Sequence, residues 1–354
     1  MNGRALSSDD RSEAGKVLEA VAPHVSTAQA AEISRVHFGI EGVAQPMTSE
    51  RDHNFRLTTA GGKSYVLKIS HPDEPPEVVD FQVRALEHIA RADPGLPAPA
   101  VVPTSAGAAT VAAGLGGAPP RLCRMLTFMQ GKLLQDAAPN PVLDRNLGSF
   151  LARLGRAMRG FFHPAAGTDL LWDIRKIGTV RSMTGDTVQA SKRRAIERAA
   201  DEYLTVAEPI LSRLRAQVVH NDMSRSNVVV DLAAGERVTG IIDFGDMMHA
   251  PLVCDIAVGA SYRWTPDEHP LAGAARFIAG YKSVQALEDE EVGVLFTLIK
   301  ARLALVCAIV EWQVRRFPEK REYVSRWNAE ITQSLLRLTE VPHPEATDIL
   351  LRAS

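Results

Sequence analysis

The sequence predicts an α+β fold with a small antiparallel β-rich lobe followed by a mainly helical lobe. Short β-branched runs separated by turns dominate residues 43–70, which is the pattern of a β-meander. After Gly131 the pattern becomes almost wholly helical, and only a hairpin at residues 218–243 interrupts it. A chain of 354 residues is long enough for two such lobes. We therefore expect one lobe at residues 1–130 and the other at residues 131–354.

The first lobe is expected to open with helices and to continue as strands. Ser26 is the expected N-cap of the second helix, because its hydroxyl can accept a backbone N–H of the first turn. Turn residues separate the strands, as in an antiparallel meander. The expected helices lie at residues 14–22, 27–38 and 76–90, and the expected strands at residues 43–48, 55–59, 64–70 and 121–130.

The second lobe is expected to consist of helices around the hairpin. Its most apolar stretch, residues 292–312, is interrupted by Lys300, Arg302 and Glu311, which favours a buried helix over a membrane span. The expected helices lie at residues 141–162, 192–215, 254–263, 270–281, 289–317 and 321–338.

The bulk composition is that of a soluble globular protein, with 45% apolar and 23% charged residues. A net charge of −2 offers no electrostatic attraction for nucleic acid or an anionic membrane, so neither is an expected partner. The three cysteines lie far apart in apolar surroundings, which favours a reducing cytoplasm. The first ten residues lack the apolar core of a signal peptide.

The hairpin region holds polar residues whose order and spacing suit phosphoryl transfer. His220 and Asp222 are followed by Asn227, five residues after the aspartate, and Asp243 opens an Asp-Phe-Gly triplet. Phosphoryl transfer needs a carboxylate that orients the attacking hydroxyl and oxygen ligands that hold Mg²⁺ against the nucleotide phosphates. Protein kinases meet these needs with His-Arg-Asp-x-x-x-x-Asn followed by Asp-Phe-Gly. Each piece alone is common elsewhere, but the ordered combination predicts a phosphotransferase.

Lys68 is the expected phosphate-binding cation. Strand alternation places its side chain on the face opposite Leu67 and Ile69. A lysine in an apolar strand often marks a sheet edge or a side chain that reaches water. Its position ahead of an acid-bearing helix instead matches the lysine that pairs nucleotide phosphates.

Two neighbouring segments are expected to complete the phosphate site. The polar turn between Ser49 and Asn54 should cover the phosphates with backbone N–H groups, although an ordinary hairpin loop is the alternative. The helix at residues 76–90 carries Glu77, Asp80 and Glu87, of which Asp80 is the expected partner of Lys68.

The strand before Gly131 is expected to be the hinge between the lobes. Its backbone around Leu126 and Phe128 would then bond the base of ATP or GTP, and the sequence does not discriminate between the two nucleotides. An unremarkable edge strand is the alternative for this segment.

This order of motifs resembles the aminoglycoside phosphotransferase/choline kinase superfamily, which has a two-lobed protein-kinase-like fold. The resemblance runs from about Gly42 to Tyr323 and is closest to the hydroxylysine-kinase-like branch. It is carried by Ser49-Glu50-Arg51-Asp52-His53-Asn54-Phe55, Tyr65-Val66-Leu67-Lys68-Ile69, Asp80-Phe81-Gln82, Trp172-Asp173 and the run Ile242-Asp243-Phe244-Gly245-Asp246 that continues to Ala257.

The resemblance implies roles for individual residues. Asp222 is then the catalytic base, Asn227 and Asp243 hold Mg²⁺, and Lys68 binds phosphate. Asp255 would support the catalytic loop from the start of its helix. Members of this branch phosphorylate hydroxyl groups of small amino-alcohols or amino acids. A small-molecule acceptor with an amino group, ATP or GTP as donor, and a monomer or homodimer are therefore expected.

Three places depart from the family pattern, and one of them is Ser224-Arg225-Ser226, which replaces the more usual loop filling and could alter acceptor contacts. Asn221 stands between the histidine and the aspartate, where the family often has glycine, and asparagine tolerates a left-handed backbone. Gln82 occupies a place where many members carry the glutamate that pairs the lysine, which leaves the partner of Lys68 open.

Four residues are candidates for the acceptor site. Asp246 and Asp173 could bind an ammonium group and Trp172 could stack on a cation. Core packing is the alternative for Trp172, and helix N-capping is the alternative for Asp173. Arg302, within an apolar helix, needs a partner, either a protein carboxylate or a substrate carboxylate. The second would favour an amino-acid acceptor.

Other functions compete with a hydroxylysine-type kinase. An aminoglycoside, choline, ethanolamine or homoserine kinase would share the same motifs, because no readable code sets the acceptor. A catalytically silent nucleotide-binding scaffold would be marked by the loss of Lys68, Asp222, Asn227 or Asp243, and all four are present.

Overall fold

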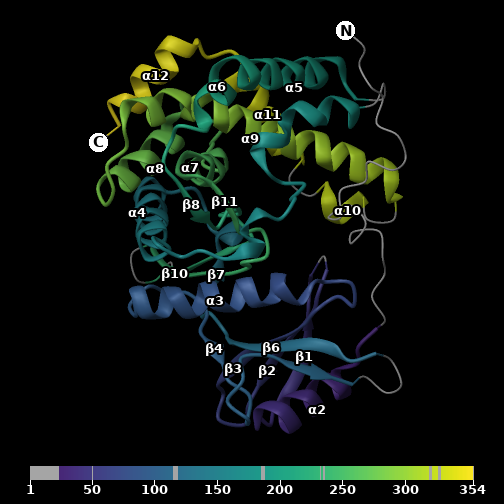
Figure 1. The fold of residues 1–354 in the computed structure, drawn as a ribbon. Coiled ribbons are helices and arrows are strands. Elements are labelled where there is room, and N and C mark those ends of the chain that lie inside the picture. Colours follow the sequence, from purple (N-terminus) through teal and green to yellow (C-terminus); the bar gives the residue numbers. More distant parts are fainter. Residues whose placement is uncertain are drawn as a thin grey trace. The chain divides into compact units, whose positions relative to one another are not determined.

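The computed structural model describes residues 24–49, 51–114, 119–184, 188–231, 233, 236–318, 321–325 and 328–353. These residues form two compact units (Figure 1). The first unit holds the described residues up to Gln130 together with His163–Leu171, and the second holds Gly131–Phe162 and the described residues from Trp172 onward. The expected helix at residues 14–22 lies outside the described residues.

The first unit is built on an antiparallel sheet in the order β1-β2-β3-β6-β4, with β5 also paired to β6. The expected meander of three consecutive strands is therefore confirmed. The strands are β1 (Val43–Met47), β2 (His53–Thr58), β3 (Ser64–Ile69), β4 (Val101–Val102), β5 (Val111–Ala113) and β6 (Arg121–Thr127), and the helices are α2 (Thr27–Phe38), α3 (Pro76–Ala92) and the short η2 (Pro164–Gly167).

Local sequence accounts for α2. Ser26 accepts the backbone N–H of Gln29, whose side chain in turn accepts the backbone N–H of Ser26, so the expected N-cap is confirmed as a reciprocal capping box. The helix ends at Gly39, which has φ of 64° in the left-handed region that glycine adopts without strain.

The two faces of this sheet have different roles. Leu67, Ile69 and Met125 point to one face, are fully buried, and belong to the cluster that also contains Ile33 and Phe38 of α2. Helix α3 meets the opposite face, where polar side chains of β3 and β6 lie. The apolar face thus holds the unit together and leaves the other face for function.

Strand β6 ends earlier than expected. Its last rung with β3 pairs Thr127 with Tyr65, and β3 itself begins at Ser64. Only Ser64 of β3 lies beyond this rung, and its backbone oxygen accepts the N–H of Phe128 at 3.4 Å, so the strand stops at Thr127 instead of continuing to residue 130.

The second unit is helical around two small sheets, as expected. Strand β9 pairs with β10 and β7, and β8 pairs with β11, so the expected hairpin is confirmed but its first strand belongs to a separate pair. The strands are β7 (Lys132–Leu133), β8 (Ala216–Val219), β9 (Val228–Asp231), β10 (Arg237–Ile241) and β11 (Met248–Pro251).

Four of the six expected helices appear with shifted bounds, whereas those expected at residues 192–215 and 321–338 are each found as separate shorter segments. The helices of this unit are η1 (Leu134–Asp136), α4 (Pro141–Ala157), η3 (Ile174–Ser182), α5 (Ala190–Glu202), the π-helical η4 (Tyr203–Ala207), α6 (Glu208–Leu211), α7 (Leu252–Ser261), α8 (Ala272–Lys282), α9 (Asp289–Arg316), α10 (Arg321–Val324), α11 (Asn328–Leu338) and α12 (His343–Leu351). Helix α4 ends before residue 162 because the chain turns through Gly160, which has φ of 78°.

Helix α9 forms the centre of the second unit. Among the described helices it is long and apolar enough to cross a membrane, but 94% of its most apolar 18-residue window is buried. This is the pattern of a core helix, as the interrupted apolar stretch predicted.

Helices α4 and α8 approach each other at glycines. A Cβ atom added to Gly148 would lie 1.8 Å from the backbone oxygen of Phe277, and one added to Gly280 would lie 2.0 Å from that of Arg145. Both distances are far inside van der Waals contact, so these positions require glycine at the helix–helix interface.

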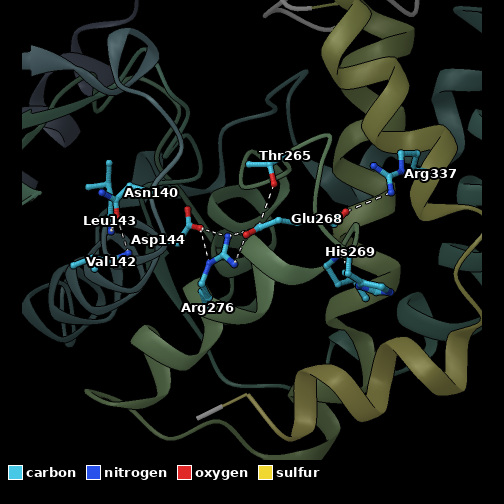
Figure 2. Close-up of polar contacts among 10 residues, drawn as sticks. Asn140, Val142, Leu143, Asp144, Thr265, Glu268, His269, Arg276 and Arg337 are labelled. Carbon is cyan, nitrogen blue, oxygen red and sulfur yellow. Dashed lines mark hydrogen bonds and ion pairs between the residues drawn. The ribbon is translucent and has the colours of Figure 1, made fainter.

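An ion-pair network joins the same two helices (Figure 2). Arg276 of α8 donates to Asp144 of α4 at 3.0 Å and to Glu268, in the preceding loop, at 2.7 Å. Arg337 of α11 donates to the backbone oxygen of Pro266 at 2.6 Å. The network therefore fixes the loop before α8 between three helices.

Candidate active site

The loop between β8 and β9 has a shape that depends on two residues. Asn221 has φ of 63°, in the left-handed region, which confirms that asparagine here takes a backbone conformation that glycine favours. Its backbone N–H donates to Asp255 Oδ1 of α7 at 2.8 Å. Burial raises the pKa of Asp255 to about 6, and the backbone N–H groups of Asn221 and His220 oppose that rise. Asp255 thus supports the loop, as expected.

His220 lies buried beneath this loop in its neutral form. Burial lowers the pKa of its imidazole to about 4, although the charge of Asp243 opposes the shift. Its Nδ1 accepts the backbone N–H of Asp222 at 3.3 Å, and its ring meets that of Phe244 edge-on with 4.8 Å between centroids. The histidine therefore connects the loop to the Asp-Phe-Gly triplet.

The structure brings Asp222, Asn227 and Asp243 together. The side-chain nitrogen of Asn227 donates to the carboxylate of Asp222 and, at 3.2 Å, to its backbone oxygen. The backbone oxygen of Asn227 accepts the N–H of Ile242 at 2.8 Å, so Asp243 follows directly beside it. The β9–β10 hairpin thereby closes a gap of sixteen positions between Asn227 and Asp243.

The charge balance at Asp222 is unfavourable to its ionised form. Burial and the charge of Asp246 raise the pKa of Asp222 to about 7, Arg302 lowers it, and Asp243 adds a smaller rise. The charges of Asp246 and Asp243 act on Asp222 with one guanidinium nearby, and this excess of negative charge attracts cations.

The donor set fits Mg²⁺. Asp243 is exposed, so its carboxylate can reach a cation. Asn227 donates through its amide nitrogen to Asp222, which leaves Oδ1 of Asn227 as the atom available to a cation. Across the described ranges, no three His, Cys, Asp or Glu residues are grouped to hold a metal by themselves. Mg²⁺ that is shared with nucleotide phosphates needs only one or two protein oxygens, so this pair suffices.

Arg302 of α9 has its polar partners within the protein. It is 2% exposed and lies 3.5 Å from Asp222 Oδ1, 3.3 Å from the hydroxyl of Tyr262 and 2.8 Å from the backbone oxygen of Trp172. Its partner is therefore a protein carboxylate. Tyr262 was not among the expected residues, because a tyrosine that follows a buried helix carries no pattern of its own.

The other three candidates for the acceptor site, Trp172, Asp173 and Asp246, differ in burial and in contacts. Trp172 packs against Val306, Val310 and Val314 of α9, which is the core-packing alternative, although its ring also lies 5.8 Å from the guanidinium of Arg302. Asp173 is buried and accepts the backbone N–H of Arg175 at 2.9 Å, which is the N-capping alternative. Asp246 is half-buried, and its charge acts on Asp222.

In the first unit, Lys68 is paired differently from the expectation. Its Nζ lies 3.7 Å from Oδ2 of Asp52, in the turn before β2. Asp80, the expected partner, is half-exposed and pairs instead with Arg84 at 3.3 Å and His163 at 3.1 Å. The physical reason is helix geometry, because Asp80 lies on the exposed side of α3.

The residues of this unit that are expected to contact the nucleotide differ in exposure and in backbone pairing. Ser49 is exposed, and Asn54 Oδ1 is buried without a hydrogen-bond partner in the described part of the chain. Leu126 lies inside the sheet, between Val66 of β3 and Val101 of β4, so its backbone faces strands on both sides. Phe128 comes just after β6, and its backbone N–H donates to the backbone oxygen of Ser64 of β3 at 3.4 Å.

Known proteins resemble this chain over most of its length. A family model described as "Phosphotransferase enzyme family" matches residues 43–290. The hydroxylysine kinase of Mus musculus is 28% identical over 326 residues, which cover 85% of this chain and 86% of that protein.

Two solved structures of kinases share the fold. The microcompartment-associated aminopropanol kinase has a TM-score of 0.68 at 18% identity and covers 92% of this chain and 100% of that chain. The amicoumacin kinase in complex with AMP-PNP, Ca²⁺ and Ami has a TM-score of 0.67 at 14% identity and covers 90% of this chain and 95% of that chain. The predicted protein-kinase-like fold class is thereby confirmed.

Proposed function

Because the chain belongs to the phosphotransferase enzyme family, we propose that it transfers the γ-phosphoryl group of ATP or GTP to a hydroxy amino acid of the hydroxylysine type. The chain is a small-molecule kinase that acts on a hydroxyl group and uses a nucleotide co-substrate. Our proposal concerns the identity of the acceptor, the metal ion and the roles of single residues.

The observation that supports the proposal most is the arrangement of Asp222, Asn227 and Asp243. In it, a carboxylate suited to orient a hydroxyl lies beside two oxygen donors suited to Mg²⁺. Asp222 accepts the proton of the acceptor hydroxyl, and Arg302 together with Asn227 holds the carboxylate in place. Mg²⁺, when bound with the nucleotide, neutralises charge on the phosphates. Lys68 binds a phosphate group in the same reaction.

The acceptor class is inferred from charge and from similarity. Asp246 and Asp222 form an anionic neighbourhood that favours an ammonium group on the acceptor. The mouse relative is named for hydroxylysine, an amino acid with both a hydroxyl and amino groups. Because Arg302 already has Asp222 as its partner, a substrate carboxylate is not required to explain its burial.

An acceptor panel tests the proposal. The full chain is assayed for nucleotide consumption with ATP and with GTP, in the presence and absence of Mg²⁺, against 5-hydroxylysine, homoserine, ethanolamine, choline, aminopropanol and an aminoglycoside. The highest kcat/KM is expected for 5-hydroxylysine, with a requirement for the metal. A clear preference for homoserine, choline or an aminoglycoside would replace the acceptor and leave the kinase assignment intact.

We also propose a cellular compartment and an oligomeric state for the protein. Cys123, Cys254 and Cys307 are all free and buried, which suits a reducing cytoplasm. A monomer or homodimer without nucleic-acid or membrane partners is proposed. Gel filtration with light scattering measures the mass directly.

A further inference from the structure

Three polar side chains lie in one row across the sheet of the first unit. Lys68 of β3 is paired with Asn54 of β2 on one side and with Arg124 of β6 on the other. Directly paired residues point to the same face of a sheet. The neighbouring pair, Leu67 with Met125, is fully buried on the opposite face. Two cations are thus presented side by side on the face away from the apolar core.

Asp52 connects these two cations. Like charges directly opposite each other destabilise a sheet unless an anion lies between them. Oδ2 of Asp52 is 3.2 Å from a terminal nitrogen of Arg124 and 3.7 Å from Nζ of Lys68. The side chains of Asp52 and Lys68 are 12% exposed and that of Arg124 is 3% exposed, so water and salt screen the three charges only weakly. One carboxylate oxygen therefore fixes both cations.

Helix α3 contributes to this row without supplying a charge. Gln82 accepts from Arg124 at 2.7 Å, and Arg124 also donates to Ser70 Oγ at 2.9 Å. An amide can orient the guanidinium but cannot neutralise the ammonium of Lys68. The negative charge beside Lys68 comes from Asp52 in the turn before β2.

We propose that Asp52 positions Lys68 for the nucleotide phosphates, and that Arg124 holds Asp52 in place. The inference rests on the proposed function, because it takes Lys68 as the phosphate-binding residue. A lysine ammonium sits on a flexible stem with about 2 kcal/mol of rotamer entropy, so a fixed carboxylate removes freedom before the nucleotide arrives. Because Asp52 belongs to the turn that is expected to cover the phosphates, the same contact ties that turn to the sheet.

The first test compares Asp52→Asn with the wild type. We expect kcat/KM for the nucleotide to fall on the order of 100-fold, the cost of misplacing a reacting group by about 1 Å, while KM for the acceptor stays unchanged. Glu32→Gln is the matched control, since it removes one carboxylate of an exposed ion pair with Arg35 in the same unit. Asp52→Glu keeps the charge on a longer stem and is expected to recover part of the loss. This variant also carries the test if Asp52→Asn does not fold.

A double-variant cycle separates positioning from structure. The Kd of the nucleotide is measured for Lys68→Met, for Asp52→Asn and for the two combined. If Asp52 acts through Lys68, the combined variant binds no more weakly than Lys68→Met alone. A further, additive loss overturns the inference, and so does a nucleotide defect in Asp80→Asn that is missing from Asp52→Asn.

The same variants distinguish the inference from the function on which it rests. Wild-type turnover and nucleotide affinity in Lys68→Met would remove Lys68 from the site and overturn its proposed role. A defective Lys68→Met together with a wild-type-like Asp52→Asn would overturn only the role of Asp52. A defect in both, with no additivity, is the expected result.

Discussion

Asp222→Asn is expected to abolish phosphoryl transfer and at the same time to stabilise the folded protein. Asn227 and Arg302 donate to different oxygens of Asp222, so the amide keeps an acceptor for one of them and nearly the same shape. The substitution removes the carboxylate that we propose as the acceptor of the hydroxyl proton, and with it one of three negative charges that act on one another. Loss of function and gain of stability should therefore occur in one variant.

The gain in stability follows from the pKa of Asp222. A rise from 3.8 to about 7 corresponds, at 1.36 kcal/mol per pKa unit, to at most about 4 kcal/mol of destabilisation by the ionised carboxylate. Since the folded-state pKa is raised, this destabilisation is fully present above pH 7, declines as the pH falls, and is absent below pH 3.8. The amide that replaces the carboxylate in this variant carries no charge at any pH, so the stability difference should follow the same window.

Two assays check the two halves of this prediction. Turnover should fall by about 10²- to 10⁴-fold, equal to roughly 3 to 5 kcal/mol of barrier, while the Kd of the nucleotide changes by no more than about twofold. Thermal melting with a chelator at pH 8 and pH 5 should show Asp222→Asn above the wild type, with the larger difference at pH 8. Asp348→Asn removes a carboxylate from an exposed ion pair of α12 and serves as the control.

Either half can fail independently. Wild-type-like turnover in Asp222→Asn would show that another group accepts the proton. A melting temperature below that of the wild type at pH 8 would show that the contacts of the ionised carboxylate with Arg302 outweigh its burial, and the electrostatic account of the site would then be wrong.

Three further predictions concern the metal and the scaffold. Asp243→Ala should weaken the binding of Mg-nucleotide but not of the metal-free nucleotide, and a titration with equal affinities would exclude Asp243 as a ligand. Gly148→Ala should lower the free energy of unfolding by at least about 1 to 3 kcal/mol through overpacking, whereas Gly155→Ala on the same helix, where the nearest atom is 3.8 Å away, should not destabilise. Arg276→Ala leaves the buried Asp144 without its ion pair and should cost about 1 to 3 kcal/mol in chemical denaturation, in contrast to substitutions at exposed pairs.

The sequence predicted those parts of the site that depend on local order. His220, Asp222 and Asn227 lie on one loop, and the hairpin that carries Asp243 is visible as two β-branched runs with a turn between them. Loop spacing and hairpin pairing are properties of short segments, so their geometry follows from the chain itself. Contacts that join distant segments, such as Arg302 of α9 with Asp222, depend on how helices pack and have no local pattern.

The partner of Lys68 shows where such reasoning went wrong and what could have corrected it. In α3 the buried residues Val79, Gln82, Leu86 and Ile89 recur at helical spacing and form one stripe that faces the unit's interior. Asp80 is two positions from Gln82, about 200° around the helix, so both cannot face the sheet. An amide on an otherwise apolar stripe predicts a buried polar partner, which is Arg124. Because the polar residue on the buried stripe of α3 is an amide, the carboxylate beside Lys68 must come from another segment. The turn before β2 supplies it as Asp52.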